Sequence, residues 1–424
     1  MHEFKYKDNQ LYCEGLKVEN LAQTFGTPLY VYSYETLTGH YLRLKEAFQG
    51  VNPLICYSVK ANSNLALLKA LVKLGAGLDI VSGGELERAH RAGCPSRKIV
   101  YASVGKTDQE ISAALTSGIL FFNVESLAEL ANINRIAGSK GVNCRVAIRI
   151  NPDVEAKTHK FITTGKITNK FGIDLNRAYQ ILLLRKKFEN VSICGLHIHI
   201  GSQITTAEPF VGAIKKVTSF INKLKLKGII LEYLNIGGGL GIIYDRETPQ
   251  TASKYAQKIL PLLRATGLKI IMEPGRFIAG NSGILVAKVL YIKPTPKKKF
   301  IIVDAGMNDL VRPALYGAYH QILPLKGKAR GKGKEELADV VGPICESGDF
   351  LAKHRLVAKV KEGEYIAVFG AGAYGFSMSS NYNSRMRAAE VLVHKNKVFI
   401  IRKRETFSDL IRNEVIPDFL KGKK

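Results

Sequence analysis

The sequence predicts an α/β chain in which a closed (β/α)8 barrel is followed by an antiparallel β domain. Short β-rich runs alternate with helical stretches over about 250 residues, the length of a typical barrel of this class. The alternation stops near Gly280, and the β-rich runs beyond it have no long helical stretches between them. An open doubly wound sheet is the alternative, but no Gly-x-Gly-x-x-Gly pattern follows the first predicted strand.

Eight β-rich runs bounded by Gly, Asn or Pro are the predicted barrel strands. They are residues 54–59, 78–81, 99–102, 120–124, 145–150, 195–200, 233–236 and 268–272. Apolar residues at helical spacing, as at Leu65, Leu68 and Leu71, predict helices between them. The clearest helices are expected at 64–74, 85–92, 108–116, 126–137 and 210–226.

The second domain is predicted from five further strand-like runs. They are residues 284–292, 300–304, 356–360, 365–369 and 391–401. Chain termini often lie close together, so the first thirty residues are expected to pair with this domain. The expected division is therefore a barrel at 31–280 and a β-sandwich-like or β-barrel-like domain formed by 1–30 and 281–424.

Composition indicates a globular, cytoplasmic protein. The chain has 424 residues, of which 46% are hydrophobic, which suits two or three domains. No apolar run reaches transmembrane length, and the N-terminus lacks a signal-peptide pattern. The six cysteines show no Cys-x-x-Cys spacing, and Cys56, Cys144 and Cys194 lie in apolar runs, so we expect reduced thiols.

The formal charge of +26 raises the question of nucleic-acid binding. The basic residues are spread along the chain, and the densest runs, 297–299 and 326–334, lie among Gly and Pro and are predicted to be solvated loops. Neither aromatic interleaving nor a nucleic-acid motif accompanies them. We therefore expect no specific nucleic-acid partner, no membrane partner and no metal site.

Lys60 ends the first predicted strand, within Tyr57-Ser58-Val59-Lys60-Ala61-Asn62. A lysine in such a place ordinarily reaches out to solvent. A lysine at a dry strand end can instead form a Schiff base, because desolvation lowers its pKa. The chemistry of (β/α)8 barrels lies at the C-terminal ends of their strands, which favours the second interpretation.

The other strand ends carry the remaining candidate residues. They are Asp79 and Glu85 after strand two, His197, His199 and Ser202 around the end of strand six, Gly237-Gly238-Gly239 after strand seven, and Glu273-Pro274-Gly275-Arg276 after strand eight. A glycine triplet is usually a turn. At this strand end it predicts a phosphate site, because glycines let the backbone approach an anion and Arg276 can add bidentate charge.

Glu273 and the two histidines complete the pattern. Glu273 either forms a salt bridge with Arg276 or holds a pyridine nitrogen protonated. His197 and His199 are two residues apart and are expected on one face of the strand, either as core histidines or, for His199, as a ring stacked on a flat cofactor. A lysine Schiff base, a phosphate cradle and a pyridinium partner together describe pyridoxal 5'-phosphate.

The chain resembles the alanine-racemase-like fold (fold type III) of pyridoxal-phosphate enzymes and, within it, the diaminopimelate decarboxylase family over nearly its whole length. The resemblance is carried by residues 57–62, His197-Ile198-His199-Ile200-Gly201-Ser202-Gln203, Gly237 to Gly239, Glu273-Pro274-Gly275-Arg276, Arg312-Pro313-Ala314-Leu315-Tyr316, Cys345-Glu346-Ser347 and Met378-Ser379-Ser380-Asn381-Tyr382-Asn383. It implies decarboxylation of meso-2,6-diaminopimelate to L-lysine and carbon dioxide, the last step of lysine biosynthesis.

The resemblance also implies a role for each residue. Lys60 would carry the cofactor, His199 would stack on its ring and Glu273 would pair with the ring nitrogen. Other residues expected around the cofactor are Asp79, Glu85, Ser202, Gly238, Gly239, Pro274, Gly275, Arg276 and Tyr374. The substrate would be bound by Arg276, Arg312, Tyr316, Glu346 and Tyr374. Cys345 would donate a proton from the other subunit of a homodimer with shared active sites.

Several alternatives stay open from the sequence. By residue type alone, Arg312 could be an ordinary surface arginine. Cys345 could be a buried, inert thiol, although the Gly- and Pro-rich surroundings of Cys345 suggest a functional loop. A decarboxylase of ornithine, arginine or carboxynorspermidine is the nearest rival, but a distal amine without a carboxylate would favour acidic residues over Arg312. Three other classes of protein are also alternatives. A non-catalytic cofactor carrier resembles a lone barrel, and an alanine racemase needs a paired tyrosine base. A nucleic-acid-binding protein would show strongly salt-dependent affinity.

Overall fold

The computed structural model describes residues 2–154, 170–327 and 334–421. The chain divides into two compact units, one of Glu35–Ser282 and one of Met1–Tyr34 together with Gly283–Lys424. Residues 328–333, which make up most of the predicted basic loop 326–334, lie outside the described residues. In the described part of the chain, no helix has both the length and the apolar character needed to cross a bilayer.

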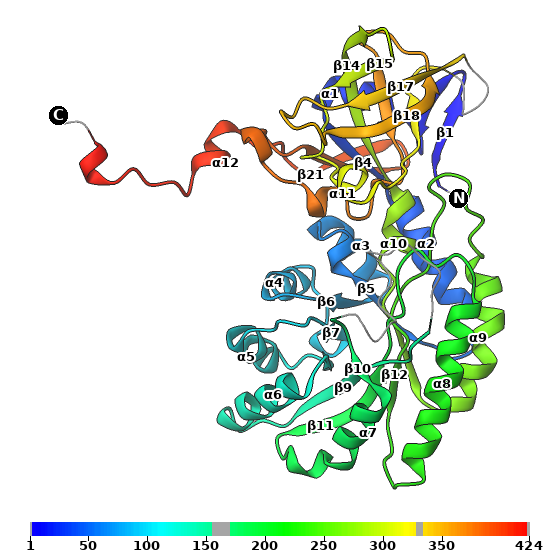
Figure 1. The fold of residues 1–424 in the computed structure, drawn as a ribbon, viewed down its shortest axis with the longest axis vertical. Coiled ribbons are helices and arrows are strands. Elements are labelled where there is room, and N and C mark those ends of the chain that lie inside the picture. Colours follow the sequence, from blue (N-terminus) through cyan, green and yellow to red (C-terminus); the bar gives the residue numbers. More distant parts are fainter. Residues whose placement is uncertain (1, 155–169, 328–333, 422–424) are drawn as a thin grey trace. The chain divides into compact units, whose positions relative to one another are not determined.

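The first unit is the predicted closed (β/α)8 barrel (Figure 1). Its eight parallel strands are β5 (Leu54–Ser58), β6 (Gly77–Ile80), β7 (Ile99–Tyr101), β8 (Phe121–Val124), β9 (Cys144–Asn151), β11 (Val191–His197), β12 (Tyr233–Asn235) and β13 (Lys269–Met272). Each strand pairs with the next, and β13 pairs with β5 to close the ring. The short β10 (Ile173–Asp174) pairs with β9.

Helices surround the strands of this unit (Figure 1). They are α2 (Tyr34–Ala47), α3 (Leu65–Lys73), α4 (Gly83–Arg91), α5 (Asp108–Ser117), α6 (Leu127–Ser139), α7 (Leu175–Leu183), α8 (Glu208–Lys225), α9 (Ala252–Thr266) and α10 (Arg276–Ala279). Polar side chains just before α3, α4, α5, α6, α7 and α9 accept hydrogen bonds from backbone N–H groups of the first turn. Such caps satisfy N–H groups that have no partner within the helix and so fix where each helix begins.

Each predicted barrel strand overlaps an observed one, but the sixth ends earlier than expected. Strand β11 ends at His197 instead of residue 200, so His199 stands in the loop that follows. Gly201 and Gln203 have φ angles of 152° and 58°, which turn the chain out of the strand direction. The expectation that both histidines lie on one strand face is therefore wrong for His199.

The second unit is the predicted, mostly antiparallel β domain. Its nine-stranded sheet contains β4 (Leu29–Ser33), β14 (Gly283–Pro294), β15 (Lys299–Val303), β16 (Ile322–Pro324), β17 (Glu335–Val341), β18 (Phe350–Ala358), β19 (Tyr365–Val368), β20 (Ala389–His394) and β21 (Lys397–Arg402). A three-stranded sheet is formed by β1 (Phe4–Lys7), β2 (Gln10–Cys13) and β3 (Leu16–Lys17). The helices are α1 (Val18–Phe25), α11 (Arg312–Tyr316) and α12 (Phe407–Ile411).

The N-terminal residues join this sheet through β4. It pairs antiparallel with β14 and parallel with β20, so it sits between strands from the second half of the chain. Its side chains Leu29 and Val31 are fully buried and belong to the same core cluster as Val391. This packing supplies the hydrophobic free energy that keeps the chain termini in one unit.

Two details of the second unit differ from the sequence prediction. The run 391–401, expected as one strand, is a hairpin of β20 and β21 with a turn at Lys395, whose φ is 56°. Apolar residues on both sides of the turn concealed it. Strand β17 was not predicted, because it begins with Glu335 and Glu336 and only later becomes apolar.

Candidate active site at the barrel mouth

Lys60 follows β5 directly, in the short 3-10 turn at Val59–Ala61. Its Nζ lies 3.1 Å from Oδ2 of Asp79 on the neighbouring strand β6. The Asp79 side chain is fully buried, whereas that of Lys60 is 38% exposed. The lysine nitrogen is therefore held against a buried carboxylate and can still be reached from the barrel mouth.

Asp79 has an unusual environment for a carboxylate. Burial raises its pKa, Glu273 raises it further, and Lys60 and the Ser58 hydroxyl oppose the rise. The Ser58 hydroxyl donates to the same oxygen, Oδ2, that faces Lys60. Its Oδ1 is buried and accepts no hydrogen bond within the described residues. A buried oxygen without a partner is costly, so this atom is suited to a donor from a bound group.

Glu273 follows β13 and is 4% exposed. Its Oε1 accepts hydrogen bonds from Asn123 Nδ2 at 2.9 Å and Asn235 Nδ2 at 2.5 Å, and its Oε2 lies 3.1 Å from His197 Nε2. Burial by itself would raise the pKa of Glu273, but His197, Lys60 and Asn235 hold that pKa well below its usual range. The barrel thus keeps an ionised carboxylate at its mouth.

This arrangement bears on the first interpretation of Glu273, the salt bridge with Arg276. Among the described residues Glu273 forms no salt bridge with Arg276, and its Oε2 lies beside His197 Nε2 instead. Arg276 instead donates from Nε and Nη2 to the Ser202 hydroxyl at 3.3 and 3.1 Å, and from Nη1 to the Tyr244 hydroxyl at 2.6 Å. Its guanidinium group is thereby fixed in a buried place at the start of α10.

His199 and the glycine triplet meet beyond the ends of β11 and β12. The N–H of Gly238 donates to His199 Nδ1 at 3.2 Å, and the N–H of Gly237 donates to Asn235 Oδ1 at 2.9 Å. Burial, Arg149 and Lys60 hold the pKa of His199 well below its usual value, so its ring is neutral and Nδ1 can accept. Two of the three glycine N–H groups are therefore hydrogen-bonded within the barrel unit, which leaves the N–H of Gly239 for the expected anion site.

The triplet has to be glycine for steric reasons. Gly239 has a φ of 107°, and a Cβ there would lie 2.6 Å from the Gly201 carbonyl oxygen. A Cβ on Gly238 would lie 2.2 Å from the Glu273 carbonyl oxygen. The loops after β11, β12 and β13 are thus packed backbone against backbone, which brings three strand ends to one place.

Glu85 lies in the first turn of α4, where Ser82 caps the helix. Its Oε2 accepts a hydrogen bond of 2.8 Å from the N–H of Val81. Burial raises the pKa of Glu85 to about 7, although the Val81 hydrogen bond opposes the rise. Glu85 is thus a carboxyl group that titrates near neutrality close to Asp79 and Lys60, whose charges both affect it.

The remaining predicted residues lie in the second unit. Arg312 begins α11 and is 7% exposed, with Nη1 2.9 Å from His320 Nε2, so the surface-arginine interpretation is wrong. Tyr316 ends the same helix. Tyr374 has a positive φ of 57° in the loop after β19.

Cys345 and Glu346 are exposed on the loop between β17 and β18. Cys345 differs from the other five cysteines, which are buried, so the interpretation as an inert core thiol is also wrong. Buried Asp349 holds this loop by accepting hydrogen bonds from the N–H groups of Ile344 and Met307 at 2.7 and 2.6 Å. The thiol is therefore presented to solvent from a fixed backbone.

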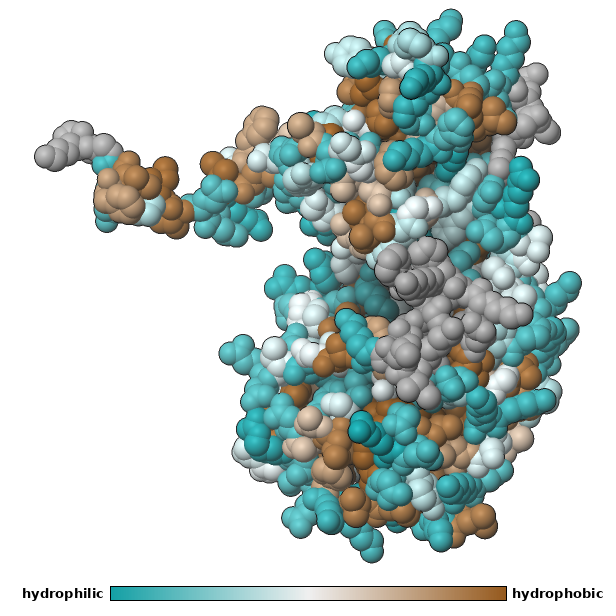
Figure 2. All heavy atoms as spheres, in the orientation of Figure 1, coloured by the Kyte–Doolittle hydropathy of each residue, from teal (hydrophilic) through white to brown (hydrophobic). Residues whose placement is uncertain are grey.

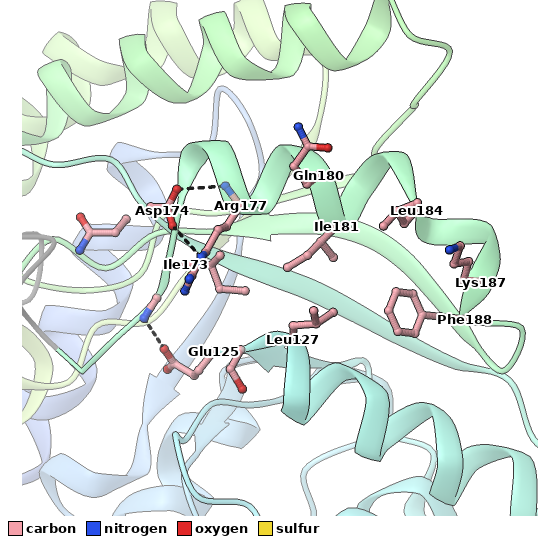
Figure 3. Close-up of a pocket in the computed structure, with 13 residues that line it drawn as sticks. Glu125, Leu127, Ile173, Asp174, Arg177, Gln180, Ile181, Leu184, Lys187 and Phe188 are labelled. Atoms are coloured by element: carbon pink, nitrogen blue, oxygen red, sulfur yellow. Dashed lines mark hydrogen bonds and ion pairs between the residues drawn. The ribbon is translucent and has the colours of Figure 1, made fainter.

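A cavity of about 810 Å³ lies elsewhere on the barrel, between α6 and α7 (Figure 3). Its floor is apolar and includes Leu127, Ile181 and Phe188, and Arg177 and Asp174 stand at one end. None of the predicted site residues is among the described residues that line it. Lys60, Asp79 and Glu273 lie instead at the barrel mouth, at the ends of β5, β6 and β13.

Sequence reasoning missed the residues that hold Glu273. His197 had been treated as a core histidine, and Asn123 and Asn235 had not been considered. A signal was present, since Asn123 and Asn235 are amides within apolar strands and are both fully buried. Buried Lys106 supports this cluster, because its Nζ donates to the Asn123 carbonyl at 2.9 Å and pairs with Glu129 at 2.5 Å.

Comparison with known proteins places this geometry in context. The family model described as pyridoxal-dependent decarboxylase, pyridoxal binding domain, matches residues 35–280. A diaminopimelate decarboxylase from Aquifex aeolicus is 52% identical over 408 residues, which are 96% of each chain.

Two solved structures extend the similarity to the whole fold. The diaminopimelate decarboxylase from M. jannaschii in co-complex with L-lysine is 41% identical, with a TM-score of 0.93 over 99% of this chain and 100% of that one. The diaminopimelate decarboxylase from Helicobacter pylori complexed with L-lysine is 44% identical, with a TM-score of 0.89 over 93% of this chain and 98% of that one.

Proposed function

The chain belongs to the pyridoxal-dependent decarboxylases, and within them to the diaminopimelate decarboxylases, and on this premise we propose that it converts meso-2,6-diaminopimelate to L-lysine and carbon dioxide. It is a carboxy-lyase that uses pyridoxal 5'-phosphate and acts in lysine biosynthesis. The observation that carries the proposal is the ionised Glu273, held by His197 and two asparagines, at the same barrel mouth as Lys60.

The residues at the barrel mouth fit this cofactor. A protonated pyridine nitrogen needs a buried anion, and Glu273 is one. Both lone pairs of its Oε1 are used by asparagine amides, whereas Oε2 faces His197 and retains one. The phenolic and phosphate oxygens need donors, and Ser202, Arg276 and the Gly239 N–H lie in the loops around the mouth. On this proposal residues 31–280 supply the cofactor site, and residues 1–30 with 281–424 supply the β domain.

Bound pyridoxal 5'-phosphate supplies an electron sink next to the substrate's α-carbon. Glu273 keeps the ring nitrogen protonated and so maintains that sink. Lys60 provides the amine that holds the cofactor, and Asp79 beside it orients the amine and stabilises its charged form. Neutral His199 offers a flat ring face without adding positive charge. Ser202, Gly238, Gly239, Pro274, Gly275 and Arg276 surround the cofactor in this proposal.

The second unit supplies most of the residues proposed to recognise the far end of the substrate, and the barrel unit adds Arg276. That end carries both a carboxylate and an ammonium group. Arg312 and Arg276 pair with the carboxylate, Glu346 pairs with the ammonium group, and Tyr316 and Tyr374 complete the binding surface. Cys345 donates the proton that replaces carbon dioxide at the α-carbon, and its exposure on a rigid loop suits that role.

Product analysis tests the reaction. The purified, cofactor-loaded protein is incubated with meso-2,6-diaminopimelate, and lysine and carbon dioxide are measured in equal amounts. Ornithine, arginine and carboxynorspermidine serve as competing substrates, because their distal ends lack a carboxylate for Arg312. Faster turnover of any of these three, or no release of carbon dioxide from diaminopimelate, refutes the proposal.

We also propose that the enzyme is a homodimer whose active sites are shared, with Cys345 and Glu346 serving the barrel of the second copy. Subunit complementation tests this. Inactive Lys60→Ala and inactive Glu346→Ala proteins are mixed and allowed to exchange subunits, so that mixed dimers contain one site with both residues intact. Partial activity is expected to return. Confirmed exchange without activity shows that both residues serve the site of their own chain.

The proposed cellular setting is the cytoplasm. All six cysteines are free thiols, and five of them are buried. Such thiols are typical of a reducing compartment. Fractionation of cells that produce the protein, with the thiols trapped before lysis, tests this setting.

A further inference from the structure

Residues 406–421, called here the C-terminal arm, expose large apolar side chains. These are Phe407 at 76%, Ile411 at 60%, Val415 at 85%, Ile416 at 64%, Phe419 at 84% and Leu420 at 63%. Figure 1 shows the arm in red, running away from the sheet of its own unit, and Figure 2 shows brown side chains along it. Single exposed apolar residues are ordinary, but six in one short segment mark an interaction surface.

The root of the arm is firmly fixed to its own unit. Arg404 donates to the Pro28 carbonyl at 2.6 Å, and Glu405 Oε2 accepts from the Arg387 N–H at 2.8 Å. The arm then begins with a capping box between Thr406 and Asp409 that starts α12. Its first turn is therefore defined by its own sequence although its apolar side chains remain exposed.

Hydrogen bonds connect the root of the arm to the loop of Cys345. The Asn381 side chain donates to Glu405 Oε2 at 2.6 Å, and the Asn383 side chain accepts from the Cys345 N–H at 2.8 Å. The turn 381–384 thus lies between the arm and the proposed proton donor. The root of the arm is therefore linked through this turn to the loop that carries Cys345.

The charge of the arm limits the kind of partner. Residues 406–424 contain the basic residues Arg412, Lys421, Lys423 and Lys424 and the acidic residues Asp409, Glu414 and Asp418. This stretch is nearly neutral in a chain of formal charge +26. Nucleic acids and anionic membranes attract basic segments, and a membrane-surface helix needs more than the five residues of α12. An apolar protein surface is the partner that remains.

We propose that the C-terminal arm packs against a second copy of this chain, and that two copies exchange arms about a two-fold axis. Six side chains that each bury about 60–120 Å² give about 700–1,400 Å² for two reciprocal arms, and the upper end of this range reaches the size of a specific interface. Edge strand β21 at the arm's root exposes Phe399 and Ile400 on opposite faces and adds to this area. The inference specifies the contact of the dimer proposed above and rests on that dimer.

Sedimentation velocity over a concentration series of the cofactor-loaded protein tests the arm. The double variant Val415→Asp/Phe419→Asp is compared with the control Leu226→Asp/Ile230→Asp, whose positions in the barrel unit are 87% and 83% exposed. Burying four charges per dimer is expected to raise the dissociation constant of the dimer about a hundredfold or more, whereas the control changes it less than about threefold. An unchanged constant in the arm variant, or an equal change in both variants, overturns the proposal.

Cross-linking gives a second measurement that does not depend on these variants. A benzoylphenylalanine introduced at position 416 is activated by light in a mixture of normal and heavy-nitrogen-labelled protein. Cross-links between light and heavy chains are expected. Cross-links confined to single chains show that the arm packs on its own chain and overturn the proposal. Neither readout needs turnover, so a dimeric but inactive protein would refute the proposed reaction and leave the arm contact standing.

Discussion

Replacing Glu273 by glutamine tests the central electrostatic feature of the site. The two side chains have the same shape, and the amide oxygen can still accept the hydrogen bonds of Asn123 and Asn235. What is lost is the negative charge that His197 and Lys60 stabilise. The cofactor is therefore expected to bind, but its ring nitrogen is no longer held protonated.

The size of the effect follows from the kind of contact. A hydrogen bond to a charged group is worth about 1.5–3 kcal/mol, and each 1.36 kcal/mol is about a decade in rate. Glu273 is 4% exposed, so solvent screens this contact little. We expect kcat for Glu273→Gln to fall by about one to two decades, while cofactor binding is retained.

The assay measures lysine formation under saturating substrate, and the carbon-13 isotope effect on the released carbon dioxide shows whether decarboxylation limits the rate. The cofactor absorbance reports loading. Glu232→Gln is the matched control, because Glu232 pairs with Arg145 and Lys269 and lies before β12, at the opposite end of that strand from Asn235. If kcat is unchanged in Glu273→Gln while decarboxylation limits the rate, the assigned role of Glu273 is refuted.

Three further predictions follow from the same geometry. Borohydride is expected to fix the cofactor to Lys60, so peptide mapping finds the label there and Lys60→Ala abolishes it, whereas exposed Lys73→Ala on α3 retains it. Arg312→Ala is expected to lower kcat/KM for meso-2,6-diaminopimelate by an amount equivalent to about 3–5 kcal/mol, because a buried carboxylate loses its partner. Lysine lacks that carboxylate, so its affinity as an inhibitor should fall less. Equal losses for the two ligands would assign Arg312 another role. The pKa of Glu85 is raised from 4.5 to about 7, so its contribution to stability is complete below pH 4.5 and is lost as the pH rises towards 7. Over that pH range the free energy of unfolding of Glu85→Gln, measured with urea, should rise by up to about 3 kcal/mol relative to that of the unchanged protein. Parallel curves of unfolding free energy against pH for the two proteins would contradict the shift.

The local pattern of the sequence was sufficient for the barrel. Strand and helix periodicities are properties of neighbouring residues, so each of the eight strands was found to within a few residues. The ends of those strands also placed Lys60, Asp79 and Glu273 at one mouth, because parallel strands of a closed barrel all end on the same side. The fold class and the composition of the mouth could thus be predicted without coordinates.

Sequence patterns failed where the neighbouring residues did not reveal a turn, the start of a strand or the end of a strand. The hairpin at Lys395 has apolar residues on both sides and was therefore predicted as one strand, whereas β17 begins with two glutamates and matched no strand pattern. The early end of β11 depends on the backbone angles of Gly201 and Gln203, which no periodicity reveals. The hairpin turn and the early strand end are differences of backbone conformation within predicted strands, whereas β17 is a strand that was missed.

Only the tertiary structure decided which side chains act on one another. Asn123, His197 and Asn235 stand on β8, β11 and β12, far from Glu273 in the sequence, and barrel closure brings them to its carboxylate. The sequence by itself determined that a carboxylate ends the eighth strand. Whether that carboxylate would be neutral from burial or ionised by its partners depended on desolvation and on contacts across four strands, which exist only once the barrel has closed.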